Sequence, residues 1–249
     1  MTKPRIEPSH FGAVYDRFQA PISKFDCGRK CAPLNGGEPV CCTTGHAIPV
    51  VHKAEFALLQ SRTELWTRFK AHDAVSRKVV SELPRSTCAV ECKGVKFCER
   101  DNRTIACRAF PFFPYLNRKG EFIGLTVYWT FEDRCWMIHR MDLTELPFIR
   151  EMVAAFERIF AFDPEEYDNM KDYSATARRV YSRAKRPLPL LGRDGGLFKV
   201  MPYTHEMLPA KPGDFKPQGA YKSEAAYKRA VKEAGGTLGP EPKGGYLAP

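Results

Sequence analysis

The sequence has no long apolar run. Its longest apolar stretch, residues 122–129, is much shorter than the roughly 20 residues that a membrane-spanning helix needs. Residues 1–8 contain no apolar segment of the kind found in a secretory signal. These absences predict a cytoplasmic protein that makes no use of a membrane.

Familiar catalytic motifs are also missing. The chain contains no GxSxG, no GxxxxGK[ST] and no GxGxxG, the signatures of a serine-nucleophile elbow, a P-loop and a dinucleotide-binding turn. No pair of acidic residues is marked by its spacing as an acid–base pair. The sequence therefore leaves enzymatic activity open and identifies no catalytic residue.

Positive charge is in excess but is not concentrated. The formal net charge is +10 at pH 7, and residues 185–249 carry 11 Lys and Arg against 6 Asp and Glu. No block of five or more like charges occurs, so there is no polybasic arm. The excess suits an anionic partner such as nucleic acid, although a solvated basic surface is the plainer interpretation.

Cysteine, by contrast, is abundant, with nine residues in the chain. The first cluster is Cys27, Cys31, Cys41 and Cys42; the second is Cys88, Cys92, Cys98 and Cys107, and Cys135 follows alone. In a reducing cytosol, clustered thiols are more often metal ligands or redox groups than disulfides. Thiolates favour zinc, iron–sulfur clusters or Cu(I), so the sequence predicts a metal centre.

Most of these cysteines are predicted ligands, enough for two four-cysteine sites. The predicted ligands are Cys27, Cys31, Cys41, Cys42, Cys92, Cys98, Cys107 and Cys135. Cys88 is the predicted bystander, and His46 is an alternative ligand. Adjacent side chains diverge in extended backbone, so Cys41 and Cys42 are expected either to bridge two sites or to divide into one ligand and one packed residue.

The spacing leaves the kind of metal open. The pairs Cys27/Cys31 and Cys88/Cys92 have the two to four intervening residues typical of zinc sites. The other gaps are irregular and favour a 4Fe–4S cluster gathered from several loops. Arg108, next to Cys107, is a candidate cofactor-binding residue because a donor to sulfur tunes a cluster; the alternative is a surface salt bridge.

The pattern outside the cysteines predicts an α+β fold: an irregular cysteine-rich metal-binding core, a short β-hairpin and packed helices. Residues 52–83 have a helical apolar period. The aromatic–proline run 110–115 is expected to be a loop that walls the metal region. Residues 122–129 are β-branched and aromatic, typical of a strand paired with the segment before Gly120.

Two further helices have start signals. Asp142 and Glu145 resemble a capping box before a helix over 147–160. Asp163 and Pro164 then have the residue types of an N-cap and a first helical position. The apolar faces of these two helices are expected to pack on each other.

The proline- and glycine-rich segment 186–196 is typical of a linker. It predicts a division into a cysteine-cluster metal-binding domain, residues 1–184, and a basic Pro/Gly-rich tail, residues 185–249. The tail is expected to be extended or weakly ordered, apart from one short helix that Ser223 caps and that ends before Gly235.

The cysteine pattern resembles the CxxCxxCC family, proteins with a zinc- or iron-chelating domain, over residues 25–136. The matching residues are Cys27, Cys31, Cys41, Cys42, Ile48, Pro49, Val50, Glu55, Cys92, Cys98, Cys107, Arg108, Ala109, Phe110 and Pro111. Nine residues, 32–40, stand where the family has a short gap. Residues 101–104 keep the Arg but not the Pro of the family's Tyr-x-x-Arg-Pro. Flagellin lysine-N-methylases have a similar cysteine pattern, but no Gly-rich nucleotide-binding loop supports that activity here.

These features predict a metal-binding protein that holds an iron–sulfur cluster in a redox or enzymatic role and meets an unidentified protein or redox partner. The alternative is a zinc-stapled adaptor that binds nucleic acid or a protein through its basic tail. Metal storage or delivery is a third interpretation. The sequence contains no feature that names a substrate.

Overall fold

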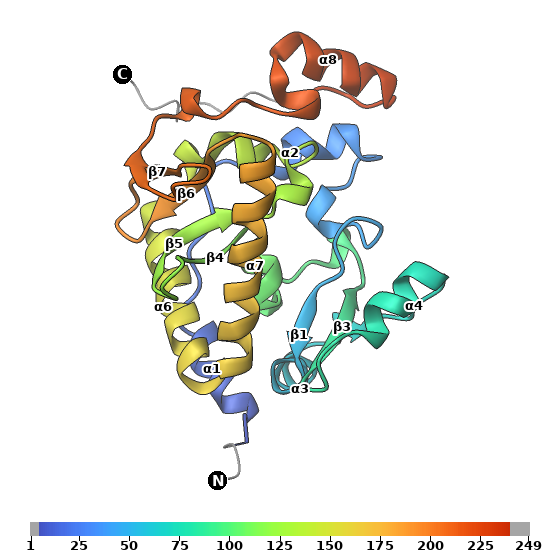
Figure 1. Cartoon of the computed structure of the whole chain (residues 1–249). Coiled ribbons are helices and arrows are strands. Elements are labelled where there is room, and N and C mark those ends of the chain that lie inside the picture. The colour runs from blue at the N-terminus through green and yellow to red at the C-terminus, as the bar shows by residue number, and fades with distance from the viewer. Residues whose placement is uncertain (1–4, 240–249) are drawn as a thin grey trace. The chain divides into compact units, whose positions relative to one another are not determined.

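The chain forms two compact units in a computed structural model that describes residues 5–239. Unit 1 comprises residues 1–17 and 41–110, and unit 2 comprises residues 18–40 and 111–249. Each unit contains helices and one antiparallel sheet (Figure 1). The predicted α+β class is confirmed at this level.

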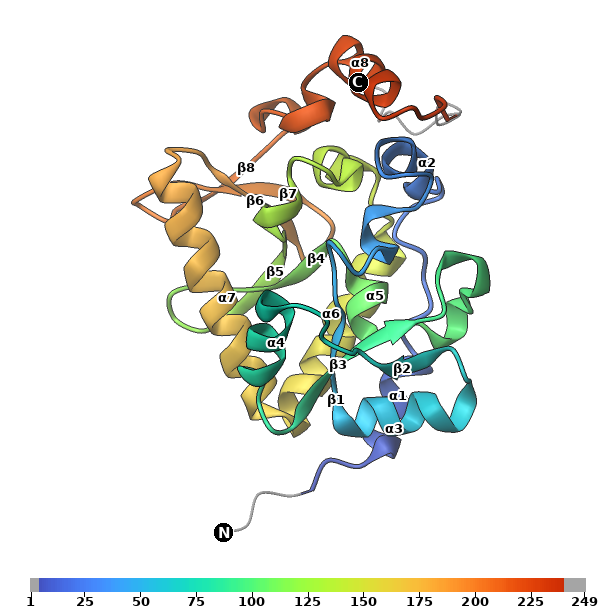
Figure 2. The ribbon, with the colours of Figure 1, turned by 90° about the vertical axis from the view of Figure 1, so that its right-hand side faces the viewer.

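Unit 1 is built on a three-stranded sheet of order β1-β3-β2 (Figure 2). Its strands are β1 (Val50–His52), β2 (Trp66–Arg68) and β3 (Thr87–Cys92). Its helices are α1 (Pro8–Tyr15), α3 (Lys53–Arg62), α4 (Ala74–Ser81) and α5 (Ile105–Ala109). Short 3₁₀ turns are η2 (Val40–Cys42, which begins at the last residue of a unit 2 segment), η3 (Val95–Phe97) and η4 (Arg100–Asn102).

The predicted helix over 52–83 is wrong in its middle part. α3 ends at Arg62, and Thr63 takes an extended conformation with φ of −158°. Leu65 and Trp66 are buried at 2% and 4% exposure, but Trp66 lies in β2, opposite Cys92 of β3. The apolar pattern therefore identified buried positions, while pairing with β3 decided the kind of element.

Unit 2 is built on a five-stranded sheet of order β4-β5-β6-β7-β8. Its strands are β4 (Phe112–Leu116), β5 (Phe122–Val127), β6 (Leu188–Gly192), β7 (Leu197–Val200) and β8 (Met207–Pro209). Its helices are α2 (Gly28–Cys31), α6 (Leu146–Phe162), α7 (Pro164–Arg183) and α8 (Glu224–Glu233). Its 3₁₀ turns are η1 (Ala32–Leu34), η5 (Trp129–Phe131), η6 (Trp136–Leu143), η7 (Pro212–Asp214) and η8 (Gly219–Lys222).

The predicted hairpin is confirmed, since β4 and β5 pair antiparallel. Its first strand contains most of the aromatic–proline run that was expected to be a loop. Phe113 and Tyr115 of this strand are each 1% exposed and pack with Met170, Ala177 and residues of β6 in the core of unit 2. The run is therefore core strand, because its side chains are covered by α7.

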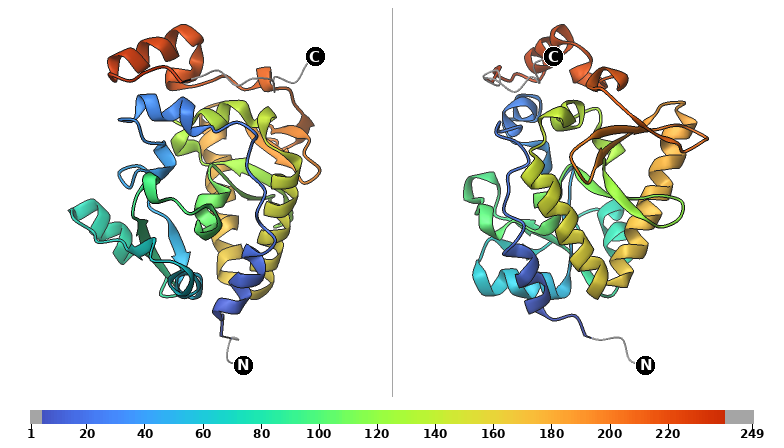
Figure 3. Two further views of the ribbon diagram at one scale, coloured as in Figure 1. Left: turned by 180° about the vertical axis from the view of Figure 1, so that it is seen from behind. Right: turned by 90° about the vertical axis from the view of Figure 1, so that its left-hand side faces the viewer.

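α6 and α7 are confirmed and lie against each other and the sheet (Figure 3). Asp163 caps α7 as predicted, its Oδ1 accepting from the Glu166 N–H at 3.2 Å. The predicted capping box before α6 is wrong. Asp142 instead pairs with Arg140 at 2.8 Å, and Glu145 is the N-cap without a side-chain hydrogen bond.

The predicted linker is also wrong. Residues 188–192 form β6, which is buried along its whole length and pairs with both β5 and β7. Pairing with β5 is confined to Leu191 and Gly192, so the missing N–H of Pro189 removes no bond from that ladder. The compact units accordingly do not divide at residue 184, and the following residues contain β7 and β8 as well as α8.

Ser223 caps α8 as predicted, its Oγ accepting from the Ala226 N–H at 3.1 Å. Tyr227 and Val231 of this helix are buried within the structure. Across residues 5–239, no helix combines the length and the apolar character needed to cross a membrane.

Candidate metal centres

The two units divide the cysteines between them. Unit 1 contains Cys41, Cys42, Cys88, Cys92, Cys98 and Cys107, and unit 2 contains Cys27, Cys31 and Cys135. All nine lie in the described part of the chain, and none forms a disulfide. The thiols therefore form one group in each unit.

The unit 1 thiol group consists of Cys42, Cys92, Cys98 and Cys107. Burial, helped by the charges of Cys42 and Cys92, raises the pKa of Cys107 to about 12. Burial also raises the pKa of Cys92, and the charges of Cys42 and Cys98 raise it further. The pKa values of these thiols are thus coupled by charge, although Cys42, the pair Cys92 and Cys98, and Cys107 come from three separate parts of the chain.

Local hydrogen bonds hold the segments that carry this group. The Trp66 indole Nε1 donates to the Asn102 carbonyl at 2.7 Å and anchors the loop that follows Cys98. Thr104, which is fully buried, is the N-cap of α5, and its Oγ1 accepts from the Cys107 N–H at 3.0 Å. The cap fixes the backbone from which the Cys107 thiol projects.

Arg103 donates a hydrogen bond to the unit 1 thiol group. Its Nε donates to the Cys98 Sγ at 3.0 Å. Burial lowers the pKa of Arg103, but this hydrogen bond and the thiolate charges outweigh burial and raise it above its ordinary value. Because the guanidinium is charged, this contact is a charge-assisted hydrogen bond.

Arg108, the predicted cofactor-binding residue, contacts a backbone carbonyl and an aromatic ring. Arg108 Nε donates to the Arg103 carbonyl at 3.1 Å, and its guanidinium lies 4.6 Å from the centre of the Tyr15 ring. The sequence pattern did not predict Arg103 as a donor to sulfur, although Arg103 lies only five residues after Cys98.

Cys88 has different surroundings. It and Cys92 are four residues apart in β3, which places their Cα atoms about 13 Å apart at the rise of a strand. This pair therefore does not form a zinc knuckle. Burial raises the pKa of Cys88, and the charged groups that act on it are Arg68, Lys53 and Glu55.

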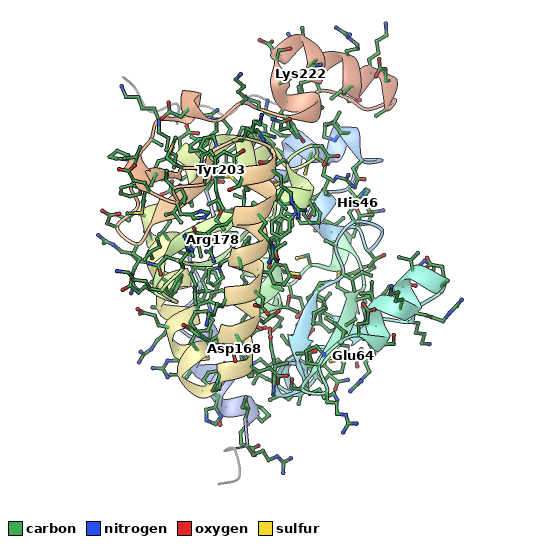
Figure 4. The ribbon with its side chains drawn as sticks, in the orientation of Figure 1. His46, Glu64, Asp168, Arg178, Tyr203 and Lys222 are labelled. Carbon is green, nitrogen blue, oxygen red and sulfur yellow. The ribbon has the colours of Figure 1, made fainter. Side chains whose placement is uncertain are left out.

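Cys41 and Cys42 do not diverge as an extended backbone would require. They end the 3₁₀ turn η2, and their Sγ atoms are 4.0 Å apart. The expectation that the Cys41 and Cys42 side chains diverge, as they would in extended backbone, is therefore wrong. His46, the alternative ligand, is exposed on the loop after η2 (Figure 4).

The unit 2 thiol group consists of Cys27, Cys31 and Cys135. Cys27 is the N-cap of α2, and Cys31 is its last residue, so the two are one helical turn apart. Cys135 is the N-cap of η6. Burial raises the pKa of Cys135, and the charges of Cys27 and Cys31 raise it further.

The C-terminal strap, residues 219–239, lies over both segments that carry the unit 2 thiol group. Tyr221 Oη donates to the Arg134 carbonyl at 3.1 Å, and a Cβ on Gly236 would lie 2.0 Å from the Pro33 carbonyl oxygen. The Lys30 Nζ lies 5.5 Å from the centre of the Tyr227 ring. Figure 1 shows α8 of the strap beside α2.

A hollow of about 610 Å³ lies between the strap and the residues that follow Cys31. Arg29 is the charged residue in a wall made mostly of glycine and alanine. This hollow gives a small molecule room beside the segment that carries two of the three unit 2 thiols.

No three Cys, His, Asp or Glu side chains within residues 5–239 are arranged so that they could hold a metal ion. The donor sets nonetheless have the right chemistry, because groups of thiolates are the usual ligands of structural zinc and of iron–sulfur clusters. A centre at either group would require the thiols to lie closer together than they do in this structure.

Comparison with known proteins finds no family model, no curated protein and no solved structure that matches the chain. The resemblance to the CxxCxxCC family therefore stays a prediction.

Proposed function

We propose that the chain is a metal-binding thiolate protein and that unit 1 holds an iron–sulfur cluster in a redox or enzymatic role. The ligands would be Cys42, Cys92, Cys98 and Cys107. The observation that carries the proposal is the Arg103 Nε donating to the Cys98 Sγ at 3.0 Å inside a group of mutually interacting thiols.

Each surrounding residue has a role that its contacts support. Arg103 stabilises negative charge on sulfur, and donors to sulfur are among the factors that set the potential of an iron–sulfur centre. Thr104 orients Cys107 by capping α5. A 4Fe–4S cluster held by these thiols would supply one-electron transfer.

A second candidate is zinc at the unit 2 thiol group, in a protein that acts as an adaptor. The observation that favours it is the arrangement of Cys27 and Cys31 at the two ends of α2, a spacing typical of structural zinc sites. Cys135 would be a third ligand. Zinc there would strengthen folding rather than carry electrons.

The deciding experiment measures iron, zinc and acid-labile sulfide in protein purified without oxygen, together with its visible spectrum. Iron and sulfide with a broad thiolate-to-iron absorption band are the expected result. Zinc without sulfide would contradict the iron–sulfur cluster and support the second candidate, a zinc-binding adaptor. Protein that takes up neither metal, although it folds, would refute both.

A further inference from the structure

Three elements of unit 2 meet along the C-terminal half of α7. The Arg178 guanidinium of α7 donates to the Leu116 carbonyl at 2.6 Å, which brings α7 to the end of β4, two residues before Arg118. One turn further along α7, the Ser182 Oγ accepts from the Tyr203 N–H at 3.4 Å. The β4–β5 turn and the β7–β8 loop, residues 201–206, are thereby tied to the same helix.

This convergence places His205 beside a cationic cluster, which consists of Arg118 and Arg178. Burial lowers the pKa of His205, and the positive charges of Arg118 and Arg178 lower it further. Among residues 5–239, none of the three forms an ion pair with a carboxylate. Cations gathered without carboxylates create a local positive potential that attracts an anion.

The loop that supplies His205 is conformationally strained. Tyr203 and His205 have φ values of 69° and 60°, in the left-handed region that residues other than glycine seldom occupy. Such strain is concentrated at functional sites. Tyr203 is 64% exposed and lies two residues before His205, so its ring is available to a ligand. Figure 4 labels Tyr203 and Arg178 over α7.

We propose that this face of unit 2 binds single-stranded nucleic acid. Arg118, Arg178 and His205 contact phosphates of the backbone, and Tyr203 stacks on a base. An exposed aromatic ring beside cations is the usual combination for single strands, because every base offers a face for stacking. The net charge of +10 adds long-range attraction. The proposal places nucleic-acid binding on α7 and two turns rather than on a flexible tail, and it is independent of the thiol groups.

The test is fluorescence anisotropy of a short fluorescein-labelled oligouridylate over a range of salt concentrations, with the full chain. Arg118→Ala is expected to weaken binding. It should also reduce the slope of the logarithm of the binding constant against the logarithm of the salt concentration by about 0.7, the value for one phosphate contact on a single strand. Tyr203→Ala is expected to weaken binding by roughly 5- to 150-fold, the effect of losing one stacked base, with the slope unchanged.

The matched control is Arg158→Ala, which removes the same charge from an exposed position of α6 and should leave the slope unchanged. Equal losses from Arg118→Ala and Arg158→Ala would overturn the proposal in favour of attraction by net charge. Full displacement of the oligouridylate by inorganic phosphate at constant ionic strength, with no effect of Tyr203→Ala, would overturn it in favour of a small phosphate ligand. Far-UV circular dichroism verifies that each variant is folded.

Discussion

At the residue scale, two arginines near Cys107 differ in their partners. Arg103 donates to the Cys98 Sγ, whereas Arg108 donates to a backbone carbonyl and covers the Tyr15 ring. Position beside a cysteine in the sequence therefore does not identify the donor to sulfur. The contribution of Arg103 can be measured directly.

Arg103→Ala should weaken metal binding by about 10- to 100-fold, the usual cost of losing a partner of a ligand. Arg100→Ala is the matched control, since Arg100 is exposed in the same loop. Competition with a chelator of known affinity measures both variants. Equal affinities in the two variants would show that the hydrogen bond to Cys98 has no part in metal binding.

Glu55 is a second residue whose behaviour can be tested. Its Oε1 accepts from the Tyr15 hydroxyl and from the Ile105 N–H, both at 2.8 Å, and Ile105 begins the helix that carries Cys107. Burial raises the pKa of Glu55 from 4.5 to about 7, although both hydrogen bonds lower it. The neutral carboxyl is therefore favoured in the folded protein.

This raised pKa predicts that stability falls as pH rises. The stabilisation is complete below pH 4.5 and is lost as pH passes through about 7. At about 1.4 kcal/mol per pKa unit, the loss is at most about 3 kcal/mol. Urea unfolding at pH 5 and pH 8 should show this loss in the wild type and not in Glu55→Gln, which keeps an acceptor oxygen. An equal loss of stability in the wild type and in Glu55→Gln would show that titratable groups other than Glu55 cause it.

At the scale of elements, local signals predicted some boundaries and missed others. Asp163 caps α7, and Ser223 caps α8, because capping involves residues only three positions apart. Residues 188–192 lie in a proline-containing segment that is typical of a linker, yet pairing with β5 and β7 makes them a strand. No local signal reports that distant pairing.

The C-terminal strap provides an element-scale prediction. Gly236→Ala would place a Cβ 2.0 Å from the Pro33 carbonyl oxygen, and such overpacking costs about 1–3 kcal/mol. The strap should then open more often, so alkylation of Cys27, Cys31 and Cys135 in the metal-free protein should be roughly 5- to 150-fold faster. Peptide mass spectrometry measures the rate at each thiol.

The control for this experiment is Gly213→Ala, because a Cβ at Gly213 would meet no atom within 4 Å. Its alkylation rates should equal those of the wild type. Unchanged rates in Gly236→Ala would mean that the strap does not shield the unit 2 thiol group.

At the scale of the whole molecule, the division of the thiols between two units predicts two centres that are lost separately. Cys107→Ser should remove the metal of unit 1, and Cys31→Ser should remove that of unit 2. Each single variant should retain only the metal of the other unit, and the double variant none, because each donor set lies within one unit.

Elemental analysis of purified variants measures these losses. Cys88→Ser is the control, since the charged groups around Cys88 are Arg68, Lys53 and Glu55, and its metal content should equal that of the wild type. Loss of all metal in either single ligand variant would contradict separate centres. Equal, negligible losses in Cys107→Ser and Cys88→Ser would refute the ligand assignment.

The sequence by itself determined the α+β class, the starts of α7 and α8, the β4–β5 hairpin and many buried positions. Each of these depends on hydrogen bonds or apolar periods within a few residues. The abundance of thiols is also a property of the sequence alone, which contains nine cysteines.

Which thiols lie close enough to influence one another depends on the tertiary structure alone. Cys42 and Cys92 are 50 residues apart in the sequence but act on each other within unit 1, while Cys88 and Cys92, which are close in sequence, are separated along β3. The same holds for the pairing of β6 with β5. Such pairings depend on how strands and loops pack over long sequence separations, and spacing along the chain does not encode that packing.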